Sequence, residues 1–182
     1  MTDPVRGYDD EKFVRNKAMY YDYDGSISQE KIEVKMKELA EKIGYQYRDI
    51  SWLKRAFYTE IKFNSNEEKY ANSPMGTLGD RVLSMIIAEK LFDENKSSEE
   101  ITKEKIEKER NSTWFEINND LKLFGFAYNN SCFYDEAPLE KRLPNSKHNR
   151  YFEALIAAIY KDCGYEVCKE IYEKVSDMRK GG

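Results

Sequence analysis

Cysteine and histidine are scarce in this chain of 182 residues. The three cysteines, Cys132, Cys163 and Cys168, cannot all pair, and they show neither zinc-ligand spacing nor a Cys-x-x-Cys redox pair, so we interpret them as reduced thiols. His148 is the single histidine, and we interpret it as an exposed loop residue rather than a catalytic base. No Ser-His-Asp or Cys-His arrangement is recognisable, which argues against a nucleophilic hydrolase.

Long apolar runs are also absent, and positive charge is not in excess. No run approaches the roughly 20 residues of a membrane helix, and the N-terminal segment "MTDPVRGYDDEKFVRNKAMYYDYDG" lacks the apolar core of a secretory signal. We therefore expect no membrane contact and a location in the cytoplasm or the nucleus. The 34 acidic and 30 basic residues give a net charge of -4, so a nucleic-acid partner requires a local basic face.

Helical periodicity dominates what is present. Apolar residues recur at helical spacing, and no alternating pattern is strong enough to predict a sheet, so the fold class is all-α. The first helix is expected between a capping box at Ser26 and a C-cap at Gly44, and Thr102 is expected to cap a later one. We divide the chain into an N-terminal appendage (1–25), one helical domain (26–178) and a C-terminal tail (179–182).

Two acids stand within strongly apolar helices. Asp80 lies in "SPMGTLGDRVLSMIIAEKLF" and Glu153 in "YFEALIAAIY". An isolated buried carboxylate tends to become neutral, whereas a pair facing a cation stays ionised, and Mg²⁺ is often held by one or two carboxylates together with substrate phosphates. The alternative is that each acid caps a helix or pairs with a nearby arginine.

Three segments, in order, resemble the ribonuclease III domain. "GYQYRDISWLKRAFYT" resembles its opening, "LGDRVLSMIIAEKLF" its signature helix, and "FEALIAAIYKDCG" its closing motif. The resemblance implies a helical homodimer that acts on double-stranded RNA. It also implies that Asp80 and Glu153 are the catalytic, metal-binding acids, with Mg²⁺ or Mn²⁺ as the ion.

The chain departs from the family pattern at the site itself. The family has four carboxylates around the metal, but Gly76 and Arg150 stand at two of these positions, and Ser73 replaces a further acid. In one interpretation Arg150 neutralises the remaining acids and replaces the metal. In the other, Mg²⁺ stays on Asp80 and Glu153, aided by the Thr77 hydroxyl or the Asn149 amide, and Arg150 holds the RNA phosphate.

The function therefore has two principal alternatives. We expect metal-dependent hydrolysis of double-stranded RNA; the alternative is a ribonuclease III-like RNA-binding or structural subunit that does not cleave, and a helical adaptor is the alternative outside both. For RNA contact we favour the residues before the closing motif, which are Lys141, Arg142, Lys147, Asn149 and Arg150.

Two further surfaces are open to interpretation. The basic residues of "KEKIEKERN" alternate with acids, which is typical of a solvated helix face stabilised by ion pairs rather than of an RNA-binding face. Met75, Leu83 and Ile87 form either a dimer face or part of the core, and their spacing favours the core.

Overall fold

The computed structural model describes residues 26–59, 61–64, 67–70, 72–129, 132–136 and 150–180, with only the backbone for the residues of the two strands. The elements are helices, apart from two short strands and one 3-10 turn. In chain order they are α2 (Gln29–Ile43), α3 (Ser51–Phe57), β1 (Ile61–Asn64), β2 (Glu67–Tyr70), α4 (Ser73–Asp93), α5 (Ser98–Lys108), α6 (Asn111–Asp120), η1 (Leu123–Phe126), α7 (Tyr151–Cys163) and α8 (Tyr165–Lys180).

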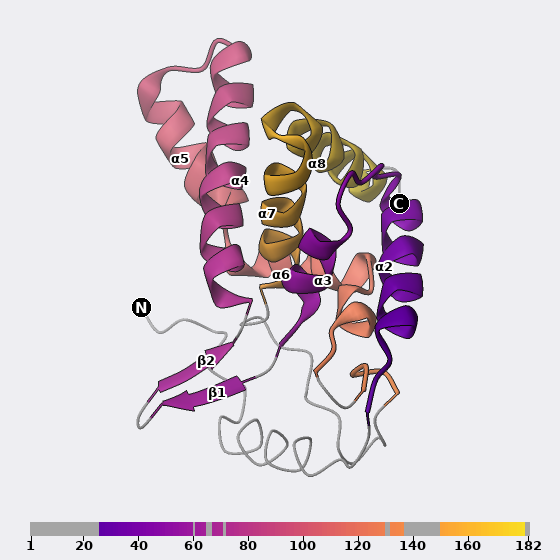
Figure 1. Ribbon diagram of the computed structural model, residues 1–182. Coiled ribbons are helices and arrows are strands. Elements are labelled where there is room, and N and C mark those ends of the chain that lie inside the picture. Colours follow the sequence, from indigo (N-terminus) through magenta and orange to yellow (C-terminus); the bar gives the residue numbers. More distant parts are fainter. Residues whose placement is uncertain are drawn as a thin grey trace.

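The core forms around α7, which runs beside α4 (Figure 1). Every residue from Tyr151 to Ile159 is buried, because α3, α4, α6 and α8 all pack against this helix. Burying a helix on all sides requires an apolar sequence over its whole circumference, as "YFEALIAAIY" provides. The all-α fold class is confirmed.

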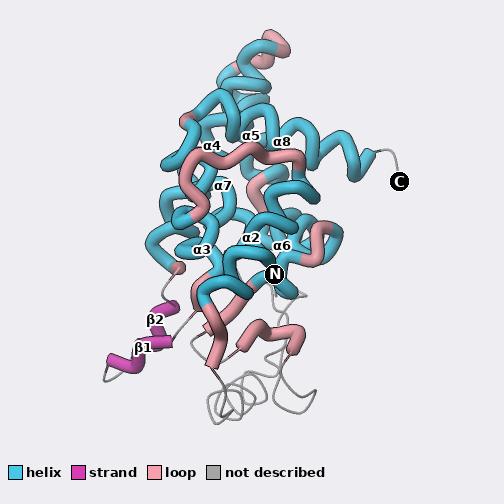
Figure 2. The backbone as a smooth tube through the Cα atoms, turned by 45° about the vertical axis from the view of Figure 1, so that its right-hand side comes forward, coloured by secondary structure: helices cyan, strands magenta, loops and turns pink. Residues whose placement is uncertain are grey.

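The break in helical periodicity after α3 corresponds to a small antiparallel hairpin. Strands β1 and β2 pair in a register that sets Ile61 opposite Tyr70 and Asn64 opposite Glu67. The hairpin extends away from the helices (Figures 1 and 2) and leads directly into the start of α4, where Pro74 occupies the first turn as expected.

Helix starts differ from two of our expectations. Helix α2 is capped by Ser28 rather than Ser26, with the Ser28 Oγ accepting the Lys31 N–H at 3.2 Å. Helix α5 begins before Thr102, because Ser97 and Glu100 form a complete capping box. The Gly44 C-cap is confirmed, with φ at 68° in the left-handed region that glycine tolerates.

A carboxylate at the end of α7 fixes the connection between α2 and α3. Asp162 accepts hydrogen bonds from the Tyr45 hydroxyl, from the Arg48 N–H at 2.8 Å and from the Asp49 N–H at 2.9 Å. Burial raises the pKa of Tyr45, so its hydroxyl remains a donor to this carboxylate. The arrangement joins residues more than 100 positions apart and holds α7 against the N-terminal half of the domain.

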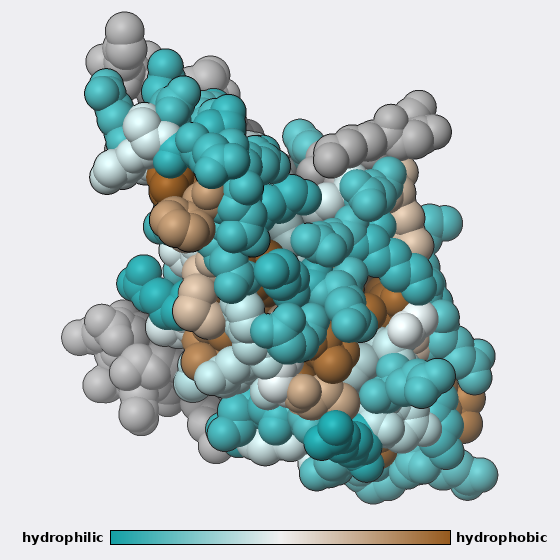
Figure 3. All heavy atoms as spheres, turned by 90° about the horizontal axis from the view of Figure 1, so that it is seen from above, coloured by the Kyte–Doolittle hydropathy of each residue, from teal (hydrophilic) through white to brown (hydrophobic). Residues whose placement is uncertain are grey.

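The face seen in Figure 3 is mainly hydrophilic, with separate small apolar patches. Helix α5 has no buried residue and carries ion pairs, among them Lys105 with Glu109 at 3.2 Å, which confirms the interpretation of "KEKIEKERN" as a solvated face. In the part of the chain that the structure describes, no helix has the length and apolar character needed to cross a membrane. Cys132, Cys163 and Cys168 are free thiols, as expected.

Candidate functional site

Helices α4 and α7 approach each other most closely where the two acids lie. A Cβ atom added at Gly79 would stand 1.7 Å from the carbonyl oxygen of Glu153, so only glycine permits this backbone contact. Asp80 is the next residue on α4 and is half-buried. The Gly-Asp pair within an apolar helix therefore has a physical reason: the glycine admits α7, and the aspartate is thereby placed near Glu153.

Glu153 is the more deeply buried acid of the pair. It is 4% exposed, and its Oε2 atom has no hydrogen-bond partner among the described residues. Burial raises the pKa of Glu153 and Asp80 raises it further, while the positive charge of Arg150 lowers it. The structure thus places Asp80 and Glu153, the two acids predicted from the sequence, close enough for the charge of one to act on the other.

Arg150 connects this acid to α4. Its Nε donates to Glu153 Oε1 at 3.5 Å, one Nη donates to the Thr77 hydroxyl oxygen at 3.3 Å, and the other donates to the Gly76 carbonyl oxygen at 3.0 Å. The Thr77 hydroxyl in turn donates to the carbonyl oxygen of Ser73 at 3.2 Å. The guanidinium therefore bridges the start of α7 and the first turns of α4.

Gly76 provides the room for this bridge. A Cβ atom at position 76 would lie 3.0 Å from Arg150 Cβ, 3.2 Å from its Nε and 3.3 Å from its Cδ. The arginine stem therefore fills the space into which a side chain at position 76 would project. Gly76 and Arg150 are therefore in direct contact in three dimensions.

The donor set does not fit a resident divalent cation. Within the described ranges no group of three or more His, Cys, Asp or Glu side chains is suitably placed to hold a metal ion. The Thr77 hydroxyl is engaged by Arg150 and by Ser73, and the arginine adds a positive charge beside Glu153. Two like unit charges 4 Å apart repel by on the order of 4 kcal/mol near a protein surface, and a divalent ion doubles that cost.

A buried asparagine, Asn118, supports the start of α7 and was not predicted from the sequence. Asn118 of α6 is fully buried, and its Oδ1 accepts the Phe152 N–H at 2.9 Å, which satisfies one of the free donors at the start of α7. The sequence signal was a polar residue within the apolar stretch "WFEINND". Asn118 thus fixes the helix end that carries both Arg150 and Glu153.

Other sequence predictions have different outcomes. The interpretation of Met75, Leu83 and Ile87 as core residues rather than a dimer face is confirmed, because they are 5%, 0% and 1% exposed. The predicted RNA-binding residues Lys141, Arg142, Lys147 and Asn149 lie outside the described residues, as does His148.

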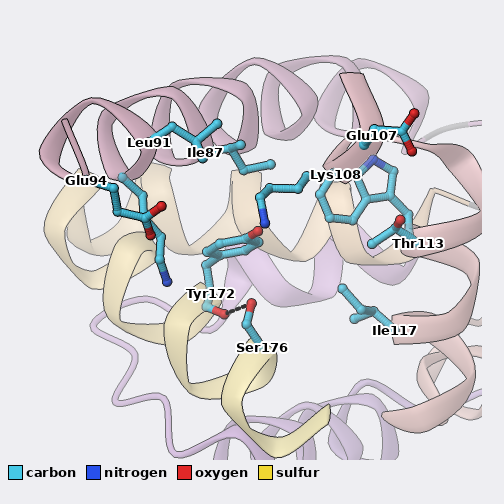
Figure 4. A pocket seen from close by; sticks show the side chains of 11 residues that line it. Ile87, Leu91, Glu94, Glu107, Lys108, Thr113, Ile117, Tyr172 and Ser176 are labelled. Atoms are coloured by element: carbon cyan, nitrogen blue, oxygen red, sulfur yellow. Dashed lines mark hydrogen bonds between the residues drawn. The ribbon is translucent and has the colours of Figure 1, made fainter. Parts of the chain in front are cut away.

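A separate hollow of about 490 Å³ lies away from the acids. It is lined from α4, α5, α6 and α8, with Thr113, Lys108 and Tyr172 among its walls (Figure 4). Neither Asp80 nor Glu153 borders it, so its chemistry is independent of the acid pair.

The fold is that of a nuclease domain. Two solved structures of the nuclease domain of ribonuclease III from Campylobacter jejuni match with TM-scores of 0.60 and 0.61, at 23% and 24% sequence identity. The matches cover 77% and 79% of this chain and 94% of each of the solved chains. This likeness establishes the helical architecture that surrounds the acids.

The sequence gives the family. The ribonuclease III domain matches residues 75–164, and the chain is 28% identical over 141 residues to ribonuclease 3 of Campylobacter fetus subsp. fetus and 30% identical over 146 residues to that of Zunongwangia profunda. These matches cover 76% and 73% of this chain but only 60% and 54% of the two relatives. Through residues 75–164 the chain belongs to the ribonuclease III domain family.

Proposed function

We propose that this domain binds double-stranded RNA without cleaving it, and that Arg150 takes the place of a metal ion at its acid site. The contact of the Arg150 guanidinium with Glu153 and with the space beside Gly76 is the observation that carries the proposal. An ion that supports phosphodiester hydrolysis must be bound next to this positive charge by the two remaining acids, and that arrangement is unfavourable.

Arg150 is also the described residue best suited to meet an RNA phosphate. Its side chain is 36% exposed, so part of the guanidinium is accessible while the rest is fixed by Gly76 and Thr77. A fixed guanidinium is pre-organised for paired hydrogen bonds to phosphate oxygens. Together with Lys141, Arg142, Lys147 and Asn149 we propose it as the RNA contact, with affinity that falls as salt rises.

Metal-dependent cleavage is the second candidate. The observation in its favour is the Glu153 Oε2 atom, which is buried without a hydrogen-bond partner among the described residues while Asp80 lies close by. On this candidate Asp80 and Glu153 are the catalytic residues and Mg²⁺ or Mn²⁺ is the cofactor. The like charge of Arg150 counts against it.

We propose a homodimer as the assembly. One solved structure of the Campylobacter jejuni nuclease domain is described by the flexibility of its region involved in dimer formation. In the present chain Met85 and Phe92, which are 50% and 70% exposed and seven residues apart on one side of α4, support a contact with a second copy. Light scattering on the wild type and on Met85→Glu tests this, because an apolar contact with a partner does not tolerate a charge.

The deciding experiment incubates the purified protein with end-labelled double-stranded RNA in Mg²⁺, in Mn²⁺ and in EDTA. We expect intact RNA in every lane and a gel shift that does not depend on the metal. Arg150→Ala should weaken the shift more than the matched control Arg81→Ala, an exposed arginine of α4. Metal-dependent cutting that disappears in Asp80→Ala would overturn the proposal in favour of the second candidate.

A further inference from the structure

We infer that the hollow bordered by α4, α5, α6 and α8 is a binding site for a small molecule that joins a planar aromatic ring to an anionic group, such as a nucleoside monophosphate. The hollow measures about 490 Å³, and pockets for small ligands usually measure about 300–1,000 Å³. Neither Asp80 nor Glu153 borders it, so the inference does not rest on the proposed function.

The hollow exists because α5 does not pack closely on the rest of the domain. No residue of this helix is buried, and its apolar Ile106 is 62% exposed. The helix contributes only two residues to the wall, Glu107 and Lys108, and both are charged. No apolar side chain of α5 therefore fills the space beside α4 and α6, which leaves room for a ligand.

The remaining walls suit an aromatic ring. Aliphatic side chains of α4 and α6 line the hollow, namely Ile87, Leu91 and Ile117. Tyr172 of α8 presents its ring to the middle of the hollow (Figure 4), and Trp114 of α6 also lines it. A flat ring bound here would bury apolar area and lie against two aromatic side chains, an arrangement that is favourable beyond the burial alone.

Trp114 adds a hydrogen-bond donor that the fold does not use. The residue is 3% exposed, and its ring packs against Phe152 with the ring centroids 5.8 Å apart. No described residue accepts a hydrogen bond from its indole N–H, although a buried tryptophan usually has such a partner. The N–H is therefore available to an acceptor group of a bound molecule.

Two lysines favour a negative charge on that molecule. Lys90 of α4 and Lys108 of α5 line the hollow, and neither forms an ion pair with an acid in the described part of the chain. The acid beside Lys108, Glu107, is paired with Arg110. The other acid in the wall, Glu94, is exposed, whereas Lys90 is half-buried, so water screens the negative charge more than the positive one. Unpaired donors thus predominate, and an anion satisfies them.

The test follows the fluorescence of Trp114 in the full chain. Trp52 is the only other tryptophan, so Trp52→Phe leaves Trp114 as the single reporter. We expect adenosine monophosphate to change its emission saturably. Adenosine should bind at least about tenfold more weakly because it lacks the anion, and inorganic phosphate should leave the emission unchanged because it lacks the ring.

A matched pair of variants in this background locates the site. Lys108→Gln should weaken the binding of adenosine monophosphate by about tenfold, because a hydrogen bond to a charged group is lost. Lys103→Gln changes another exposed lysine of α5, which does not line the hollow, and should leave the binding unchanged. Equal effects of the two variants would overturn the inference, because binding would then be a general response to charge.

Melting curves distinguish two sources of the ligand, since a molecule that binds the folded state raises the melting temperature. Adenosine monophosphate represents the nucleotides, and naphthoate represents the aromatic carboxylates. A rise with either molecule that Lys108→Gln reduces and Lys103→Gln retains supports the site, and the larger rise identifies the class. No rise with either molecule, or an equal rise with adenosine and its monophosphate, would overturn the inference.

Discussion

Replacing Gly79 by alanine should separate the two helices that carry the acids. The added Cβ would stand 1.7 Å from the carbonyl oxygen of Glu153 and 2.5 Å from its carbonyl carbon. Both are backbone atoms in the first turn of a packed helix, so they cannot rotate away as a side chain can. The main adjustment available is a shift of α4 relative to α7.

The size of the effect follows from this distance. An ordinary contact begins at 3.4 Å, so the helices must move apart by the difference from 1.7 Å, which is about 1.7 Å. Overpacking a core usually costs about 1–3 kcal/mol, and a clash with rigid backbone belongs at the top of that range. Alanine returns about 1 kcal/mol through helix propensity, which leaves a net loss of about 2 kcal/mol, or a fall in melting temperature of about 4–8 °C for a domain of this size.

Thermal unfolding followed by circular dichroism measures this loss. Gly76→Ala is the matched control, because it makes the same change three residues earlier on the same helix and meets only the movable side chain of Arg150. Gly79→Ala should be the more destabilised of the two. A melting temperature equal to or above that of the wild type would show that α4 and α7 do not depend on close backbone contact at Gly79.

Two further changes test the charges around α7. Asp162→Ala removes the acceptor of the Tyr45 hydroxyl and of two backbone N–H groups, and should cost roughly 1–3 kcal/mol in urea unfolding; unchanged stability would contradict the role of this carboxylate. Glu153→Gln should stabilise the domain at pH 7. Burial raises the pKa of Glu153, so the folded protein favours the protonated side chain, and the stability that this form contributes is lost as pH rises through the folded pKa. Melting curves should show this gain shrinking as pH falls from 7 towards 4.5, the ordinary glutamate value, and levelling off below it; a gain independent of pH would contradict the raised pKa.

The placement of the two acids could be predicted because the residues that indicate it lie close to each acid in the sequence. Asp80 and Glu153 each stand among apolar residues at helical spacing, which indicates buried helices, and acids in buried helices need partners. The contact between Arg150 and Glu153 could also be predicted from the sequence, since residues three apart on a helix are neighbours.

What could not be predicted depends on atoms far apart in the sequence. The clash that requires glycine at position 79 involves the backbone of residue 153, and the buried Asn118 acts on an N–H group 34 positions later. Helix starts were misplaced because several serines and threonines lie close together and each can act as a cap: Ser97 rather than Thr102 caps α5, since Glu100 completes its capping box. The helical periodicity breaks over residues 61–74, and this can be seen in the sequence. The register in which β1 pairs with β2 depends on both strands at once, so it could not be predicted.

The contact between Gly76 and Arg150 also constrains which substitutions the two helices accept. In its present position the Arg150 side chain occupies the space that a larger side chain at position 76 would need. A change at position 150 alone leaves the buried Glu153 without its counter-charge. Relatives that carry an arginine at position 150 should therefore carry a glycine at position 76.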